Sequence, residues 1–205
     1  MPSRARTSAA VHDLEIHPLT PDRWPDLEAL FSTNAVTRDC WCMWFRLTTA
    51  EYEAGRKEPN RIAFRGIVER APAPPGLLAY IHGQAVGWCA LAPREEYPRV
   101  RRARAMKPID DRPAWAITCF FVRRDARGRG VTKALLRAAV DFARAHGATL
   151  IEGYPVDTSM GRVTPDAAYH GPLKLFADAG FTEVARRDGR RVIVRKRVRP
   201  ARPRT

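Results

Sequence analysis

The chain has 205 residues, of which 45% are hydrophobic and 28% are charged. This length and composition are typical of one folded domain with enough residues to bury a core. No apolar run approaches the roughly 20 residues that a membrane helix needs, and no apolar stretch of signal-peptide length follows the basic first residues. The composition argues against a membrane-spanning protein, and we expect a cytoplasmic location.

The formal net charge of +14 brings nucleic acid into consideration as a partner. The charge is unevenly spread, because residues 186–205 hold ten Arg or Lys against one Asp. Such a run is more often a solvated strand edge and tail than a binding surface. We therefore expect no nucleic-acid partner and keep this function only as an alternative.

The chain holds four cysteines: Cys40, Cys42, Cys89 and Cys119. Disulfides are rare in the cytoplasm, and Cys40 and Cys42 are closer together than the usual paired zinc ligands. We expect buried thiols and no metal site.

Hydrophobic periodicity predicts alternating strands and helices along the chain. Thr20 is expected to cap a first helix, whose apolar face holds Leu27, Leu30 and Phe31. Residues 38–45 carry a run of cysteines and aromatics that no periodicity classifies. The other predicted elements are a strand at 14–16, a helix at 60–69 with Ile62, Phe64 (or Ala63), Ile67 and Val68 as its apolar positions, a hairpin at 77–81 and 85–91, a strand at 115–122, a helix at 131–146 that Gly147 ends, a strand at 150–154, a helix at 172–179 and a hairpin at 181–187 and 191–198.

Strands that come before, between and after helices predict an α/β or α+β fold with one mixed sheet. We expect a disordered tail over residues 1–12, a single domain over 13–198 and a basic tail over 199–205.

The segment between the strand at 115–122 and the helix at 131–146 has the features of a phosphate-binding loop. It contains Arg127-Gly128-Arg129-Gly130, and its glycines let the backbone approach a ligand. The amino end of the following helix adds partial positive charge, so a diphosphate fits there. The spacing is not GxxxxGK[ST], and Lys133 stands where a dinucleotide fingerprint needs its third glycine.

This loop resembles the coenzyme A signature of the GNAT superfamily of N-acyltransferases, [Q/R]-x-x-G-x-[G/A]. The match runs from Arg127 to Thr132, and Thr132 departs from the usual Gly or Ala. Downstream, Leu175-Phe176-Ala177-Asp178-Ala179-Gly180-Phe181 resembles the family's L-Y-x-x-x-G-F helix end. In element order the resemblance covers most of residues 77–198.

The resemblance implies a six- or seven-stranded mixed sheet that splays open in its centre and is flanked by helices. It also implies that acetyl-CoA is the co-substrate, that its acyl group passes directly to an amine, and that a backbone N–H near Val122 stabilises the oxyanion. The pantetheine arm would pair with the backbone of Phe120, Phe121 and Val122. The pyrophosphate would contact the amides of Arg127, Gly128, Arg129, Gly130, Val131, Thr132 and Lys133.

The general acid is the main departure, because Phe176 stands where the family usually has a tyrosine. Tyr169, seven residues upstream, is the first candidate to protonate the thiolate, and Tyr154 is the second. Glu152 is the first candidate for the base, on a strand whose apolar neighbours suggest partial burial. Glu95, Glu96 and His170 stay open as alternatives.

In the family, the region before the second helix lines the acceptor site, so Trp41, Trp44 and Phe45 are expected to form an apolar wall there. For at least half of the side chains in the run, simple core packing is the better explanation. We expect an N-acetyltransferase for a small-molecule or peptide amine, as a monomer or homodimer. A non-catalytic acyl-CoA-binding module is the alternative that Phe176 suggests.

Overall fold

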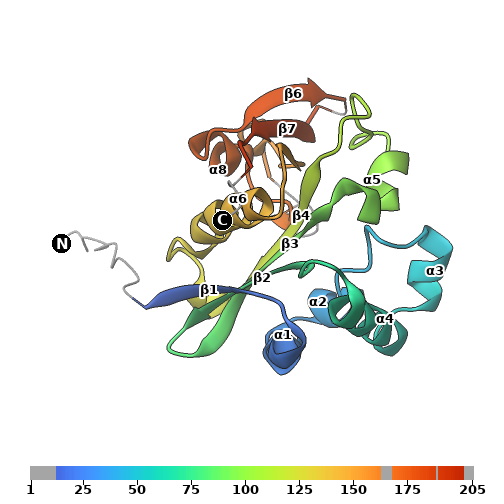
Figure 1. Ribbon diagram of the computed structural model, residues 1–205, viewed down its shortest axis with the longest axis vertical. Helices are drawn as coiled ribbons and strands as arrows, with labels where there is room; N and C mark the ends of the chain where they lie inside the picture. The colour runs from blue at the N-terminus through green and yellow to red at the C-terminus, as the bar shows by residue number, and fades with distance from the viewer. Residues whose placement is uncertain (1–12, 163–167, 188, 201–205) are drawn as a thin grey trace, which may run out of the picture.

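A computed structural model describes residues 13–162, 168–187 and 189–200. These residues form a seven-stranded sheet in the order β1-β2-β3-β4-β5-β7-β6 (Figure 1). Only β4 and β5 pair in parallel; the other neighbours are antiparallel. The strands are β1 (Leu14–Pro18), β2 (Gly76–Ile81), β3 (Gln84–Pro93), β4 (Trp115–Val122), β5 (Leu150–Gly153), β6 (Thr182–Arg186) and β7 (Val192–Arg197).

The sheet opens between β4 and β5. The two strands pair only where residues 115–117 face residues 151–153. On its other edge β4 pairs with β3 along nearly its whole length, but the register shifts so that Thr118 has no partner. This extra residue is a bulge, which bends a strand locally. The predicted mixed sheet with a central splay is therefore confirmed.

Helices cover both faces of the sheet. Those on one face are α6 (Val131–Ala145) and α8 (Leu173–Asp178); those on the other are α1 (Trp24–Ser32), α2 (Ala35–Cys40) and α4 (Glu58–Arg70). Two short helices, α3 (Thr49–Ala54) and α5 (Pro98–Arg102), lie on the right in Figure 1. Single 3-10 turns occupy Pro21–Arg23, Arg94–Glu96, Arg124–Ala126 and Thr158–Met160.

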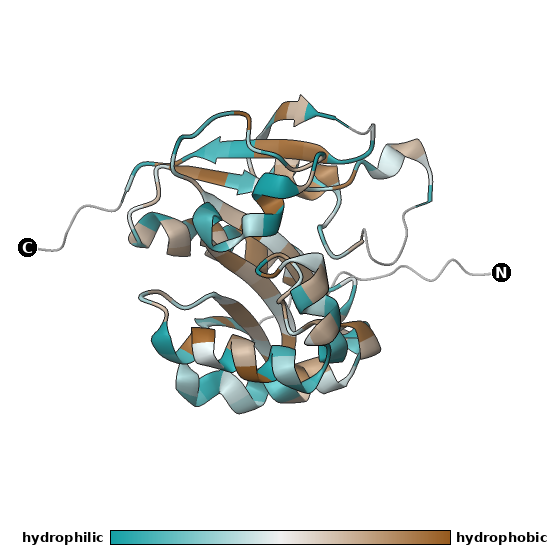
Figure 2. Cartoon of the chain, turned by 90° about the vertical axis from the view of Figure 1, so that its right-hand side faces the viewer, coloured by the Kyte–Doolittle hydropathy of each residue, from teal (hydrophilic) through white to brown (hydrophobic). Residues whose placement is uncertain are grey.

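The side chains of β2 show how the two layers arise from alternation. Leu77, Ala79 and Ile81 pack with α6, while Leu78 and Tyr80 pack with α1 and α4. Successive side chains of a strand point to opposite faces, so a strand covered on both sides is apolar throughout. Figure 2 agrees, with brown central strands between helices that carry much of the teal.

Helix α6 follows its prediction closely. Val131, Leu135 and Ala139 are buried against the sheet. Gly147 ends the helical segment with a φ of +83°, a left-handed conformation that suits glycine. None of the described helices is both long and apolar enough to span a membrane.

Two local predictions were wrong, and one helix was missed. The Thr20 hydroxyl caps no backbone amide; it accepts a hydrogen bond from Arg23 Nη1 at 3.0 Å. Ile62 is 60% exposed and lies off the buried face of α4. Helix α3 was missed although Thr48 and Glu51 form a reciprocal capping box, a pattern visible in the sequence.

Candidate functional site

The loop between β4 and α6 has the backbone that its glycines predict. Gly128 and Gly130 have φ values of +75° and +79°, which side chains with a Cβ rarely adopt. A Cβ added at either position would meet no protein atom within 4 Å. The glycines therefore leave open space beside the backbone of this loop.

Positive groups surround this space. Ala134 N–H donates to the Gly130 carbonyl at 3.1 Å, so the amides of residues 131–133 precede the first hydrogen bond of α6 and point out of its amino end. Arg127, Arg129 and Lys133 are exposed. Arg127 Nε also donates to the Val122 carbonyl at 3.1 Å, which ties the loop to the end of β4.

Beyond residues 115–117, the edge of β4 that faces away from β3 is partly hydrogen-bonded to another segment. The Phe120 N–H donates to the Tyr169 carbonyl at 2.6 Å. An arm that pairs with the backbone of Phe120 must therefore take the place of that carbonyl. The contact also brings Tyr169 beside β4, although 49 residues separate it from Phe120 in the sequence.

A cavity of about 650 Å³ lies on the α1 and α2 side of β4. Thr118, Cys119 and Phe121 of β4 contribute to its wall, together with Tyr169 and His170. Its polar groups also include two carboxylates and two guanidinium groups, those of Asp39, Glu53, Arg56 and Arg191. The bulge of β4 thus borders the cavity, while the end of β4 leads into the glycine loop.

Tyr169 is held by contacts on two sides. Its ring stacks on Phe121 with centroids 6.4 Å apart. Its hydroxyl donates to Asn34 Oδ1 at 3.3 Å. Asn34 also caps α2, because the same oxygen accepts from the amides of Val36 and Thr37. The sequence analysis singled out Tyr169 but not Asn34. Asn34 caps α2, a helix of only six residues that the sequence analysis did not predict.

Comparisons with known proteins identify the family of the chain. The sequence model of the acetyltransferase (GNAT) family matches residues 41–159, more than half of the chain. The chain belongs to this family. A comparison with curated proteins finds no match.

Solved structures share the GNAT fold at low identity. PaiA N-acetyltransferase from Thermoplasma acidophilum, in complex with coenzyme A, is 15% identical with a TM-score of 0.53, covering 90% of this chain and 99% of its own. An acetyltransferase related to histone acetyltransferase HPA2 from Corynebacterium glutamicum is 20% identical with a TM-score of 0.51, covering 93% and 98%. An acetyltransferase from Thermus thermophilus is 18% identical with a TM-score of 0.51, covering 92% and 99%. At these identities the likeness concerns the fold.

In this GNAT chain, two of the candidate catalytic side chains lie away from the cavity. Glu152 is fully buried and accepts hydrogen bonds from Arg94 at 3.0 Å, from Arg195 at 2.7 Å and from the Tyr154 hydroxyl at 2.9 Å. Burial raises the pKa of Tyr154 well above its usual value, and the charge of Glu152 adds to this effect. Neither residue contributes to the cavity wall, and both belong to a buried cluster of ion pairs and hydrogen bonds.

The expected acceptor wall is only partly formed by the predicted aromatics. Trp44 and Phe45 line the cavity. Trp41 is 5% exposed and packs in the core, stacked on Trp24. Trp41 and Cys42 both have positive φ, of 47° and 54°. Two consecutive residues with left-handed backbone interrupt any helix or strand, which explains why residues 38–45 show neither a helical nor a strand period.

Phe176, at the family's tyrosine position, lies in the core between β4 and β5. Its ring contacts Phe120 and Phe181 with centroid distances of 6.1 and 5.2 Å. Gly153 leaves the room for it, because a Cβ there would lie 2.2 Å from the Phe176 ring. The side chain is part of the hydrophobic core and has no proton to donate.

The cysteines carry free thiols. Cys40, Cys42 and Cys119 line the cavity, while Cys89 is buried in the core. Burial raises the pKa of Cys40 to about 11, so its thiol is protonated at neutral pH. Within the described part of the chain, no three His, Cys, Asp or Glu side chains gather as a metal site.

Replacement of Gly130 tests the cradle. We expect Gly130→Val to weaken acetyl-CoA binding more than about tenfold, because the side chain enters the space beside the amides and disfavours the left-handed backbone. Gly147→Val is the matched control, since Gly147 has a φ of +83° and equally open surroundings at the other end of α6. Both variants should lose a similar roughly 1–2 kcal/mol of stability. Calorimetry that finds unchanged affinity in Gly130→Val would refute the cradle.

His170 predicts a loss of stability in mild acid. Burial lowers the pKa of His170 to about 3, and the charge of Arg191 acts in the same direction. A histidine in the unfolded chain has a pKa of about 6.5. Between about pH 6.5 and about pH 3, His170 therefore binds a proton in the unfolded chain but not in the folded chain, so the free energy of unfolding falls as pH decreases. We expect up to about 1.4 kcal/mol per pH unit from this group.

Denaturant unfolding at pH 7 and pH 5 measures this effect. His170→Gln should have a smaller drop in the free energy of unfolding than the parent. An equal drop in both proteins would show that the imidazole does not titrate differently in the folded and unfolded states.

Proposed function

We propose that this GNAT chain is an acetyl-CoA-dependent N-acetyltransferase acting on an amine of a small molecule or peptide. One observation carries the proposal: β4 connects both halves of the site. Its end leads into the loop with Gly128 and Gly130, and its bulge at Thr118 borders the cavity of about 650 Å³. A thioester that lies along this edge would meet an acceptor held in the cavity.

The chemistry is a direct acyl transfer. The amine nitrogen attacks the thioester carbonyl carbon; a C–N bond forms, the C–S bond breaks, the nitrogen loses a proton and the thiolate gains one. Tyr169 is the proposed acid, because its phenol lies in the cavity wall beside β4. Removal of such an acid typically costs about 10²–10⁴-fold in rate.

The base is proposed among the groups that line the cavity. Asp39 and Glu53 meet this condition, whereas Glu152 does not. His170 also lines the cavity, but its lowered pKa makes it a weak base. Asp39 Oδ1 is buried without a hydrogen-bond partner among the described residues. A buried acceptor atom in this state favours a donor such as an amine.

Release of free CoA tests the proposal. The protein is incubated with acetyl-CoA and a panel of amines, and CoA is measured by chromatography. We expect release that depends on the amine and is lost in Gly130→Val. Acetyl-CoA binding without release for any amine would instead favour the non-catalytic binding module that Phe176 suggests.

A further inference from the structure

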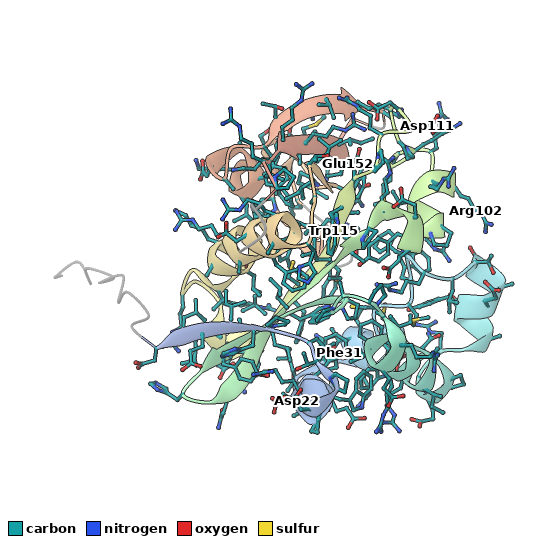
Figure 3. All side chains as sticks on the ribbon, in the orientation of Figure 1. Asp22, Phe31, Arg102, Asp111, Trp115 and Glu152 are labelled. Atoms are coloured by element: carbon teal, nitrogen blue, oxygen red, sulfur yellow. The ribbon has the colours of Figure 1, made fainter. Side chains whose placement is uncertain are left out.

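A second cavity of about 470 Å³ adjoins the first. Trp44, Phe45, His170 and Arg191 line both, so the two cavities are neighbours that share these residues in their walls. The second also contains Arg99 and Arg102 of α5, and none of the described residues that line it carries a carboxylate. Figure 3 shows Arg102 on the α5 side of the molecule.

Arg99 is fixed in position by neutral groups. Its Nε donates to the Trp44 carbonyl, and its Nη1 donates to Thr49 Oγ1 at 3.1 Å. The guanidinium carbon lies 3.8 Å from the centroid of the Trp44 ring. A planar guanidinium stacked in this way is ordered before any ligand arrives, which lowers the entropic cost of binding.

The lack of a counter-ion distinguishes Arg99 from the other enclosed arginines. Arg46 pairs with Glu96 at 2.7 Å, and both Arg94 and Arg195 pair with Glu152. Across the described residues no carboxylate forms an ion pair with Arg99, and its Nη2 is buried without a hydrogen-bond partner. A partly buried cation of this kind is stabilised by an anion that binds next to it.

The first cavity has the opposite character at its α2 and α3 end. Asp39 and Glu53 line it, and the single guanidinium of Arg56 lies 4.0 Å from Asp39 and 3.2 Å from Glu53. Two carboxylates around one guanidinium leave a net negative charge, which attracts an ammonium group. The two neighbouring cavities therefore have opposite charge, acidic at the α2 and α3 end of the first and basic in the second.

We propose that the acceptor is an amine that also carries an anionic group, a carboxylate or a phosphate, and that Arg99 and Arg102 bind this group. The inference rests on the proposed acyl transfer and specifies its acceptor. The phosphates of coenzyme A are not the occupant, because the β4–α6 loop and α5 lie on opposite sides of the molecule (Figure 1).

Matched acceptors test this specificity. Tryptophan is compared with tryptamine, and the phosphate ester of ethanolamine with ethanolamine; each pair differs in the anionic group. We expect a higher kcat/KM for the anionic member of at least one pair, and the pair that shows it distinguishes carboxylate from phosphate. In Arg99→Gln this preference should fall about 10- to 100-fold, the range for hydrogen bonds to a charged group.

Three further variants serve as controls. Arg102→Gln should reduce the preference less, and Arg99→Lys should retain part of it. Arg104→Gln should leave it unchanged, because Arg104 is exposed and lines neither cavity. If circular dichroism shows Arg99→Gln unfolded, Arg102→Gln and Arg99→Lys decide the question.

Calorimetry with the CoA-bound protein and the same four compounds separates this inference from acyl transfer. Tighter binding of an anionic member that is lost in Arg99→Gln supports the anion site even without turnover. Equal binding and equal kcat/KM within both pairs overturns it, even if CoA is released.

Discussion

Glu152→Gln is expected to lower the free energy of unfolding by about 3–5 kcal/mol, the usual cost of removing one partner from a buried ion pair. The carboxylate is fully buried and binds both Arg94 and Arg195. Gln keeps the shape of the side chain but removes the carboxylate charge that pairs with the guanidinium groups of Arg94 and Arg195. Figure 3 shows Glu152 inside the part of the sheet that β6 and β7 complete.

Glu69→Gln is the control for this experiment. Glu69 also pairs with an arginine, Arg65, at 2.9 Å, but both side chains are about half exposed. Exposed pairs of this kind contribute only about 0.3–0.5 kcal/mol. Chemical denaturation should separate the two variants by several kcal/mol. If Glu152→Gln is as stable as the parent yet inactive, Glu152 is the base after all.

Tyr169→Phe is expected to lower kcat about 10²-fold or more while KM for acetyl-CoA changes little. The ring can still stack on Phe121, whereas the phenolic proton and the 3.3 Å bond to Asn34 are lost. Tyr154→Phe should affect kcat less, because the Tyr154 hydroxyl is buried against Glu152.

A pH–rate profile of both mutants and the parent measures this effect. We expect the basic limb of the kcat profile to change in Tyr169→Phe only. Full kcat with an unchanged basic limb would show that Tyr169 is not the acid and that solvent or Tyr154 protonates the thiolate.

The fold was predictable where local patterns determine it. Strand β4 is found at the predicted residues 115–122, and α6 ends one residue before its predicted end. Alternation and the helical period act over neighbouring residues, so they are visible in one sequence. The pairing of residues 115–117 with residues 151–153 depends on distant contacts, and only the family resemblance suggested the splay.

The site was predictable in part for the same reason. The glycine loop is contiguous in sequence, and its two positive φ angles follow from the two glycines. The cavities are assembled from α2, α3, α5, β4 and the segment around Tyr169. No local pattern indicates that Arg99 stacks on Trp44 from 55 residues away, or that a second arginine neutralises Glu152.

Transfer of a labelled acetyl group tests the central claim most directly. The protein is given acetyl-CoA with an isotope in the acetyl carbonyl, together with the panel of amines that includes the two matched pairs. We predict that the label appears in an amide of the acceptor in equal amount to the CoA released, and that none remains on the protein. If the protein binds acetyl-CoA but all of the label stays in acetyl-CoA, acyl transfer is contradicted. If label is found on the protein, direct attack is contradicted.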